Sequence, residues 1–246
     1  MYKKGIYKIL TNEPLTDTVW RMTLRGDTQW ITAPGQFVNI ALAGRYLRRP
    51  ISVCDWDEQT LTLVYKVVGG GTAQMSRMAP GTELDLLTGL GNGFSVDNAA
   101  LRPLLVGGGV GVPPLYNLAR RLLARGLRVQ VVLGFNSAAE VFYAEEFRAL
   151  GCEVTVATAD GTAGIRGFVT DAIAAQGLDF DYFYACGPLP MLRALCEGVS
   201  QDGQLSMEER MGCGFGGCMG CTCKTKAGPK RICREGPVLT KDEVFW

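Results

Sequence analysis

Five of the nine cysteines in this chain of 246 residues lie in one short segment near the C-terminus. Cys213, Cys218 and Cys221 follow the spacing C-x4-C-x2-C, and eleven residues separate Cys221 from Cys233. Four thiolates with a tight loop of this kind are the ligand set of a plant-type [2Fe–2S] cluster. Glycines between the first three cysteines let the chain wrap closely and present backbone N–H groups to sulfur. The spacing therefore favours an iron–sulfur centre held by these four residues.

Structural zinc is the main alternative for this segment, because zinc also accepts four cysteine ligands. Zinc sites usually combine two C-x2-4-C units, and here a second pair exists only if Cys221 and Cys223 form a poorly fitting C-x-C unit. A disulfide-rich tail is a third alternative. Cys223 has no assigned ligand role in the iron–sulfur interpretation.

The rest of the composition limits the kinds of catalytic site, metal site and partner that this chain can have. The chain contains no histidine, which excludes a Ser-His-Asp triad, a histidine general base, a two-histidine zinc protease and a Rieske cluster. With 25 basic and 24 acidic residues the formal net charge is +1, which gives no indication of a nucleic-acid or membrane partner. The N-terminal residues lack the apolar core of a secretory signal. We therefore expect a cytoplasmic protein, in which thiols stay reduced and a disulfide-rich tail is disfavoured.

Two glycine-containing turns follow apolar segments in the second half of the chain. Gly107 to Gly111 follows an apolar segment and precedes a helical one, where free N–H groups favour an anion, although the strict G-x-G-x-x-G spacing is absent. Ligands of open α/β sheets bind outside the carboxyl ends of the strands, so the turn at 186–188, after the last strand, is expected to line the same crevice. The alternatives are that the glycine turn binds no ligand and that Cys186 is simply a buried apolar residue. The residues expected around the nucleotide are Gly108, Gly109, Gly111, Cys186, Gly187 and Pro188.

Two further candidate anion sites lie in the first half of the chain. Arg49 precedes a short apolar strand, and a guanidinium suits a phosphate group. The glycines at 69–71 lead into Thr72 at an expected helix start, which offers backbone donors. Two anion sites in one small domain suggest a dinucleotide. A solvated surface arginine and an ordinary glycine loop are the alternatives.

The spacing of apolar residues predicts the elements that must position these groups. Residues 19–24 and 61–67 read as strands, and the Pro-Gly pairs at 34–35 and 80–81 mark turns, which together predict a small antiparallel β-barrel. From residue 101 strands alternate with helices, which predicts a doubly wound parallel α/β sheet. The expected strands cover 104–106, 129–133, 153–157 and 182–185, and the expected helices cover 113–125, 139–150, 170–175 and 191–199. The predicted domains are a barrel over 1–98, an α/β domain over 99–203 and a cysteine domain over 204–246.

Together these motifs resemble the ferredoxin-reductase superfamily over nearly the whole chain. Arg49-Pro50-Ile51-Ser52 stands where that superfamily has a flavin-binding Arg-x-Tyr-Ser/Thr, with isoleucine in place of tyrosine. The segment 89–94 resembles its Pro-Leu-Gly-x-Gly-Phe link, with Thr88 before the glycine. The resemblance implies an FAD-binding barrel, an NAD-binding α/β domain and a small [2Fe–2S] domain. The FAD contacts it implies are Arg49, Pro50, Ile51, Ser52, Val64, Tyr65, Lys66, Gly71 and Thr72.

The segment from Glu208 to Val238, with its four cysteines, narrows the resemblance to the electron-transfer subunits of NAD-dependent, iron–sulfur dihydroorotate dehydrogenases. This resemblance implies a separate FMN-containing catalytic subunit that oxidises dihydroorotate, in an assembly of two copies of each chain. Electrons would pass through the [2Fe–2S] cluster and FAD to NAD+ during pyrimidine biosynthesis. Hydride transfer needs positioning rather than an acid or base, so no catalytic residue is expected in this chain.

Two other functions fit parts of the same pattern. A flavoprotein that moves electrons between NADPH and ferredoxin or sulfur compounds would use the same modules. The segment 134–137 offers no arginine for a 2′-phosphate, which favours NAD. A function of another class is a zinc-binding regulatory module on a vestigial nucleotide fold, or a redox sensor that acts by binding partners. An absorption spectrum with iron and zinc analysis would distinguish these functions.

Overall fold

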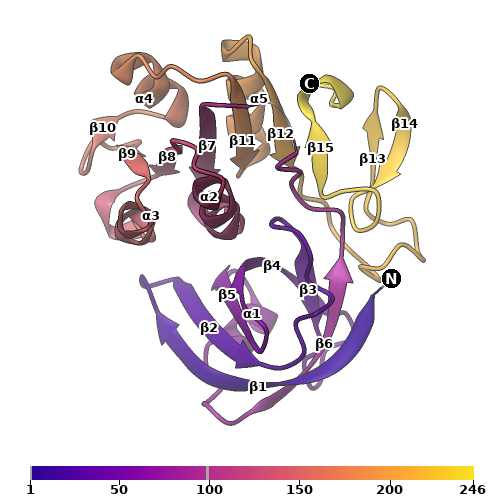
Figure 1. Cartoon of the computed structure of the whole chain (residues 1–246). Coiled ribbons are helices and arrows are strands. Elements are labelled where there is room, and N and C mark those ends of the chain that lie inside the picture. Colours follow the sequence, from indigo (N-terminus) through magenta and orange to yellow (C-terminus); the bar gives the residue numbers. More distant parts are fainter. Residues whose placement is uncertain (1, 98–99) are drawn as a thin grey trace.

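The computed structural model describes residues 2–97 and 100–246. A β-barrel forms one half, and a sheet with helices on both faces forms the other (Figure 1). The C-terminal segment lies beside the sheet and near the N-terminus (Figure 1). These parts confirm the expected combination of an antiparallel barrel with a parallel α/β sheet.

The barrel is closed by six antiparallel strands in the order β1-β2-β5-β4-β3-β6. Val38, Ile40, Leu61 and Leu63 are fully buried and belong to one apolar core inside it. In β5, Leu61 and Leu63 alternate with half-buried threonines, so one face of the strand points inward. A short helix, α1 (Gly70–Met75), adds the buried Met75 to this core. The strands are β1 (Lys3–Pro14), β2 (Val19–Arg25), β3 (Phe37–Ile40), β4 (Arg49–Trp56), β5 (Thr60–Lys66) and β6 (Glu83–Leu90).

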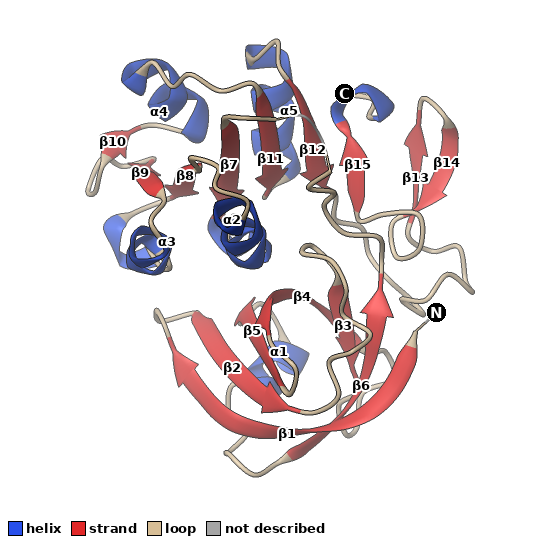
Figure 2. Ribbon diagram, viewed as in Figure 1, coloured by secondary structure: helices blue, strands red, loops and turns tan. Residues whose placement is uncertain are grey.

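The α/β half is a seven-stranded sheet in the order β10-β9-β8-β7-β11-β12-β15, and only β15 runs antiparallel to its neighbour. Helices α2 and α3 cover the face towards the barrel, and α4 and α5 cover the other face (Figure 2). The strands are β7 (Pro103–Gly108), β8 (Gln130–Phe135), β9 (Glu153–Thr158), β10 (Ile165–Arg166), β11 (Tyr182–Cys186), β12 (Asp202–Ser206) and β15 (Val238–Thr240). The helices are α2 (Pro114–Ala124), α3 (Ala144–Leu150), α4 (Val169–Gln176) and α5 (Leu189–Gly198).

The C-terminal segment leaves the sheet after β12, forms the cysteine loop and returns to the sheet. A hairpin of β13 (Thr222–Thr225) and β14 (Gly228–Arg231) follows the loop, and β15 then pairs with β12. The sheet therefore continues past residue 203, where the sequence places the start of a separate cysteine domain. That three-domain division stays a prediction, and its first boundary, between 98 and 99, lies outside the described residues.

One predicted element is shorter than expected. A helix over 139–150 is predicted, but α3 begins only at Ala144, after a 3-10 turn at Ala138–Glu140. Tyr143 has φ 65°, which an α-helix does not allow. The rings of Phe142 and Tyr143 pack edge-on against Phe135 and Tyr116, respectively, so packing of aromatic side chains overrides local helix propensity here.

Within the described part of the chain, none of the helices is long and apolar enough to cross a membrane.

Candidate functional site

The cysteine loop brings the four predicted ligands together as two pairs. The backbone N–H groups of Gly217 and Cys218 donate to Cys213 Sγ at 3.2 and 3.4 Å, and Cys213 N–H donates to Cys218 Sγ at 3.4 Å. In the second pair, Cys233 N–H donates to Cys221 Sγ at 3.4 Å. Cys218 is exposed, whereas Cys221 and Cys233 are buried. The loop therefore has one limb at the surface and one limb in the core.

Backbone conformation around the first pair depends on residues without side chains. Gly214 and Gly216 have φ values of 75° and 92°, which disfavour any residue with a Cβ. A Cβ at Gly212 would lie 3.1 Å from Cys218 Sγ, which is a tight contact. The glycines thus leave space for sulfur and for a group bound to it.

Cys213 and Cys233, one from each pair, have pKa values shifted in opposite directions. Burial raises the pKa of Cys213, but hydrogen bonds from backbone N–H groups, led by that of Phe215, outweigh it and lower this pKa to about 6. Burial, together with the neighbouring thiol of Cys221, raises the pKa of Cys233 to about 12. Ligation by a metal centre would displace the proton that Cys233 otherwise holds.

The chemistry of the donor set fits a [2Fe–2S] cluster, because such a cluster takes four cysteine thiolates, and backbone N–H groups already donate to the sulfur atoms of both pairs. Among residues 2–97 and 100–246, no three cysteine or carboxylate side chains already converge to metal-binding distances. Cys213, Cys218, Cys221 and Cys233 would hold the cluster, which would supply one-electron transfer at this loop. Cys223 lies on β13, half-buried against the apolar core.

Arg49 and Gly71, predicted to contact FAD, lie against each other. A Cβ at Gly71 would fall less than 3.0 Å from Arg49 Nε, so the guanidinium covers the start of α1. Arg49 donates only to the carbonyl oxygens of Leu47 and Arg48 within the described residues. Its charge therefore remains available to an anion such as the diphosphate of FAD.

A second arginine, which the sequence did not single out, joins this position. Arg45 donates to Gly70 O at 3.1 Å and to Gln74 Oε1 at 3.4 Å. Thr72 Oγ1 accepts N–H groups from Val68 and Gly69 and so closes the glycine turn from within. Two guanidinium groups beside the start of α1 form a suitable cradle for a diphosphate.

The other predicted FAD contacts lie on β4 and β5, with side chains in different surroundings. Ser52 and Pro50 are half-buried, and Ile51 packs at the edge of the barrel core. Tyr65 points into the core and donates to Asn12 Oδ1 at 2.9 Å, so only its backbone remains for a cofactor outside. Val64 packs instead with the apolar residues between the barrel and the sheet, and Lys66 is half-buried at the end of β5.

The two glycine-containing turns predicted to line a nucleotide crevice are packed against each other. Because β7 and β11 are neighbouring parallel strands, Gly107 is paired with Cys186. A Cβ at Gly111 would fall less than 3.0 Å from the carbonyl of Cys186 and the nitrogen of Gly187. A Cβ at Gly108 would meet Pro188 Cδ at 3.0 Å. Only glycine permits this approach, and Gly109, with φ 51°, lies in open space at the turn.

A hollow of about 450 Å³ adjoins this edge of the sheet. Burial raises the pKa of the thiol of Cys186, next to Gly187 in this turn, to about 12, so this thiol is neutral at physiological pH. The hollow is lined by Gly187, Leu189, Pro190, Glu208, Glu209 and Arg210.

Helix α2 fixes the sheet to the barrel beside these sites. Asp55 of β4 accepts from Asn117 Nδ2 at 2.6 Å and from Arg120 at 2.7 Å. Arg121 lies over the ring of Trp56, 4.8 Å from its centroid. The strand with the predicted flavin contacts is therefore held directly against the nucleotide-binding half.

Comparisons with known proteins agree with this geometry. Residues 208–245 match the iron-sulfur cluster binding domain of dihydroorotate dehydrogenase B, and residues 105–197 match the oxidoreductase NAD-binding domain. The dihydroorotate dehydrogenase B (NAD(+)) electron transfer subunit of Bacillus mycoides is 44% identical, over 99% of both chains. That of Bacillus caldolyticus is 47% identical, over 94% of both. The chain belongs to this family.

A solved structure of an NADH-dependent reduced ferredoxin-NADP oxidoreductase, studied for flavin-based electron bifurcation, is also similar. It has a TM-score of 0.89 and 30% identity, over 98% of this chain and 90% of that chain. The cytochrome P450 reductase GcoB of Amycolatopsis, at 23% identity and TM-score 0.70, shares the fold over 80% of this chain and 65% of that chain. Membership of the family supports FAD, NAD and a [2Fe–2S] cluster as the cofactors of this electron-transfer subunit.

Sequence reasoning missed several residues that shape this subunit. Arg231 pairs with Glu235 and donates to Gly216 O at 2.7 Å, which ties the hairpin to the cysteine loop. Asn92 donates to Val238 O at 2.7 Å and accepts from Val238 N at 3.0 Å. Asn92 stands in the 89–94 motif, but no local pattern indicated its distant partner.

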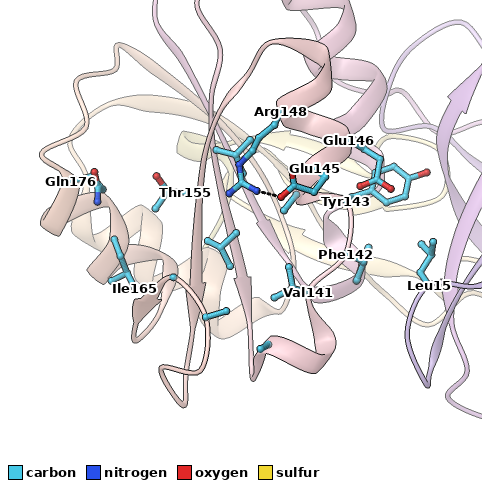
Figure 3. Close-up of a pocket in the computed structure, with 16 residues that line it drawn as sticks. Leu15, Val141, Phe142, Tyr143, Glu145, Glu146, Arg148, Thr155, Ile165 and Gln176 are labelled. Carbon is cyan, nitrogen blue, oxygen red and sulfur yellow. Dashed lines mark hydrogen bonds and ion pairs between the residues drawn. The ribbon is translucent and has the colours of Figure 1, made fainter.

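The larger of the two hollows described lies away from all these residues. It measures about 870 Å³ and opens beside α3 and β9, where Arg148 pairs with Glu145 (Figure 3). None of the predicted cofactor residues lines it. Size alone therefore does not mark the functional site of this molecule.

Proposed function

We propose that this chain takes electrons from a dihydroorotate-oxidising, FMN-containing partner subunit and delivers them to NAD+ through a [2Fe–2S] cluster and FAD. The observation that carries the proposal is the joining of three cofactor sites through one barrel. Strand β4 carries the flavin residues, α2 of the nucleotide half packs on β4, and the cysteine loop contacts the adjacent β3. Family membership over nearly the full chain supports the same relay.

The residues of this chain act by binding and positioning. FAD, when bound, exchanges a hydride with nicotinamide and single electrons with an iron–sulfur centre. Arg49 and Arg45 hold its diphosphate against the start of α1, and the packed turns at Gly111 and Gly187 hold the nucleotide. The neutral thiol of Cys186 supplies no proton at physiological pH. Correct placement in a closed site is then the main contribution of the protein.

The exposed end of the cysteine loop is the proposed docking surface for the partner. Cys218 lies at the surface, and Phe215 and Met219 beside it are 39% and 56% exposed. The ring of Tyr2 lies 5.2 Å from that of Phe215 and enlarges this apolar area. Exposed aromatic and methionine side chains are typical of protein interfaces. We propose an assembly of two copies of each subunit in a reducing, cytoplasmic compartment.

The test is anaerobic purification of the chain with and without its co-expressed partner. The chain alone should show flavin and iron–sulfur absorption bands and should oxidise NADH with artificial acceptors. NAD+ reduction by dihydroorotate should require the FMN-containing partner. Colourless protein that contains zinc and no flavin would contradict the proposal.

A second candidate function is electron transfer between a nicotinamide nucleotide and ferredoxin, because one neighbour named as such an oxidoreductase covers 98% of this chain. One feature after β8 favours NAD+ as the acceptor. Asn136, just after β8, donates to Glu140 at 2.8 Å, and a carboxylate there suits a ribose hydroxyl and repels a 2′-phosphate. If reduced ferredoxin but not dihydroorotate with the partner drives nucleotide reduction, the second function replaces the first.

A further inference from the structure

Strand β3 lies between the flavin strand and the cysteine loop. Val38 and Ile40 point into the barrel core, so Phe37 and Asn39 point to the opposite face. Phe37 is paired with Ser52 and Asn39 with Pro50 across the ladder to β4. Phe37 shares its buried apolar cluster with Cys221 and Cys233. One face of β3 is thus adjacent to flavin residues through the ladder and adjacent to cluster ligands through its side chains.

Asn39 makes the polar contact between these two parts. Its Nδ2 donates to the carbonyl oxygen of Cys213 at 3.0 Å, across 174 residues of sequence. The side chain is only 1% exposed. A Cβ at Gly214 would fall less than 3.0 Å from Asn39 Nδ2, so the loop is shaped to accept this amide. The contact therefore fixes the backbone at a cluster ligand rather than a distant part of the loop.

The other end of the same amide is unsatisfied. Asn39 Oδ1 is buried and has no hydrogen-bond partner within the described part of the chain. A buried acceptor without a donor lowers stability, and an apolar side chain of the same shape would avoid that cost. An asparagine is therefore a poor choice for packing alone at this position. Its N–H donation to Cys213 is what a leucine could not provide.

We propose that Asn39 is a positioning residue for the iron–sulfur centre, which holds the Cys213 limb on the barrel and thereby sets the separation and coupling between the cluster and FAD. This inference rests on the proposed function, since it presupposes both cofactors. The buried amide links the loop to a barrel strand, and Asn39 is paired with Pro50 next to the flavin contact Arg49. Loss of the donor releases the surface limb, while the buried Cys221 and Cys233 still bind.

The experiment compares Asn39→Leu and Asn39→Asp in the full chain loaded with FAD and cluster. Both variants keep the approximate shape of asparagine, and both lack the N–H donor at physiological pH. NADH should reduce FAD at the wild-type rate, while transfer from FAD to the cluster should slow by on the order of tenfold. The EPR signal of the reduced cluster and its midpoint potential should shift in both variants. The melting temperature of Asn39→Leu should stay near the wild-type value, because loss of the hydrogen bond to Cys213 is offset by removal of the unsatisfied Oδ1.

The matched control is Asn12→Leu. Asn12 Nδ2 also donates to backbone carbonyl oxygens, those of Met75 and Met78 at 2.9 and 3.0 Å, but within the barrel half and away from the cysteine loop. This variant should lower the melting temperature and leave the EPR signal unchanged. If Asn39→Leu fails to fold, Asn39→Ser, which is too short to reach the carbonyl, provides the same comparison.

Three results would overturn the inference. Unchanged EPR signal and transfer rate in Asn39→Leu would show that the donor has no role. A change only in Asn39→Asp would assign the effect to a buried charge. An equal spectral change in Asn12→Leu would assign it to general destabilisation. Absence of cluster and flavin from the wild-type chain would instead contradict the proposed function itself.

Discussion

Cysteine side chains have three different roles in this protein, and burial and backbone contacts decide the role of each one. Cys54, Cys152 and Cys196 are buried, and burial raises their pKa values to about 12, 11 and 11, as expected for packing residues. Cys186 is neutral at the nucleotide edge for the same reason. Cys213, by contrast, receives several backbone N–H groups that stabilise its thiolate. Sequence spacing identified this last group, because ligand geometry imposes spacing and packing does not.

Replacing Cys218 by serine tests the ligand assignment. Removal of one of four thiolates should abolish the visible iron–sulfur bands and lower bound iron to less than about a tenth. FAD should stay bound and NADH oxidation by artificial acceptors should continue, because the flavin residues lie on β4 and α1. Absorption spectra and iron analysis measure the change. Cys223→Ser is the matched control and should retain the cluster, whereas unchanged iron in Cys218→Ser would refute the assignment.

The pH dependence of hydride transfer tests the absence of acid–base catalysis. The chain has no histidine, and the pKa of Cys186 is raised from 9.0 to about 12, so this thiol keeps its proton at every pH below about 9. Burial of the neutral thiol therefore costs no stability below pH 9, and stability falls as pH rises from 9 towards 12. Reduction of FAD by NADH, followed by stopped flow, should change less than about twofold between pH 6 and 9. A bell-shaped profile in this range would identify an acid or base.

At the scale of elements, the sequence predicted the helix ends that are determined by neighbouring residues. The helix predicted over 113–125 is found as α2 (Pro114–Ala124), because proline starts it and Gly126, with φ 77°, ends it. The helix predicted from 139 failed where Tyr143 takes a left-handed conformation to pack its ring. Pairing of β15 with β12 was not predictable, since a three-residue strand has no pattern of its own and depends on a partner far away in sequence.

The contact between the β7 and β11 turns gives a prediction at this scale. In Gly111→Ala, the new Cβ would overlap the backbone at Cys186 and Gly187 and force the two turns apart. Because backbone cannot rotate away as a side chain does, the Kd for NADH should rise at least about tenfold, or 1.4 kcal/mol. Titration of the FAD-loaded chain measures this change. Gly198→Ala, in α5 with nothing within 4 Å of its Cβ, should bind NADH normally. Equal affinities in the two variants would exclude a tight nucleotide turn at Gly111.

At the scale of the whole molecule, the site is made by contacts between segments that are distant in sequence. Arg49 lies against Gly71, and Asn39 contacts Cys213, so neither pairing follows from a local motif. The sequence identified most of the groups but could not show that β3 and β4 place the cysteine loop beside the flavin strand. Long-range packing provides this arrangement, because each of the parts buries apolar surface against the barrel.

The contact of Asp55 with α2 tests whether the orientation of the two halves controls hydride transfer. In Asp55→Ala, the buried amide of Asn117 loses its acceptor and Arg120 loses its ion pair. The variant should lose about 1–3 kcal/mol of unfolding free energy. The rate of FAD reduction by NADH should fall on the order of tenfold, because small misplacements of the reacting atoms are costly. FAD content and the cluster spectrum should stay unchanged, since Asp55 contacts neither site.

The matched control for this prediction is Glu153→Ala, which removes an exposed ion pair with Arg128 from the α/β half alone. Exposed pairs contribute little, so its unfolding free energy should change by less than about 1 kcal/mol and its rate of FAD reduction should match that of the wild type. If Asp55→Ala also reduces FAD at the wild-type rate, the barrel and the sheet hold their orientation through apolar packing alone. If Asp55→Ala instead reduces FAD slowly but binds NADH with wild-type affinity, the polar contact controls the orientation of the nicotinamide on the flavin, because binding and orientation would then be separable.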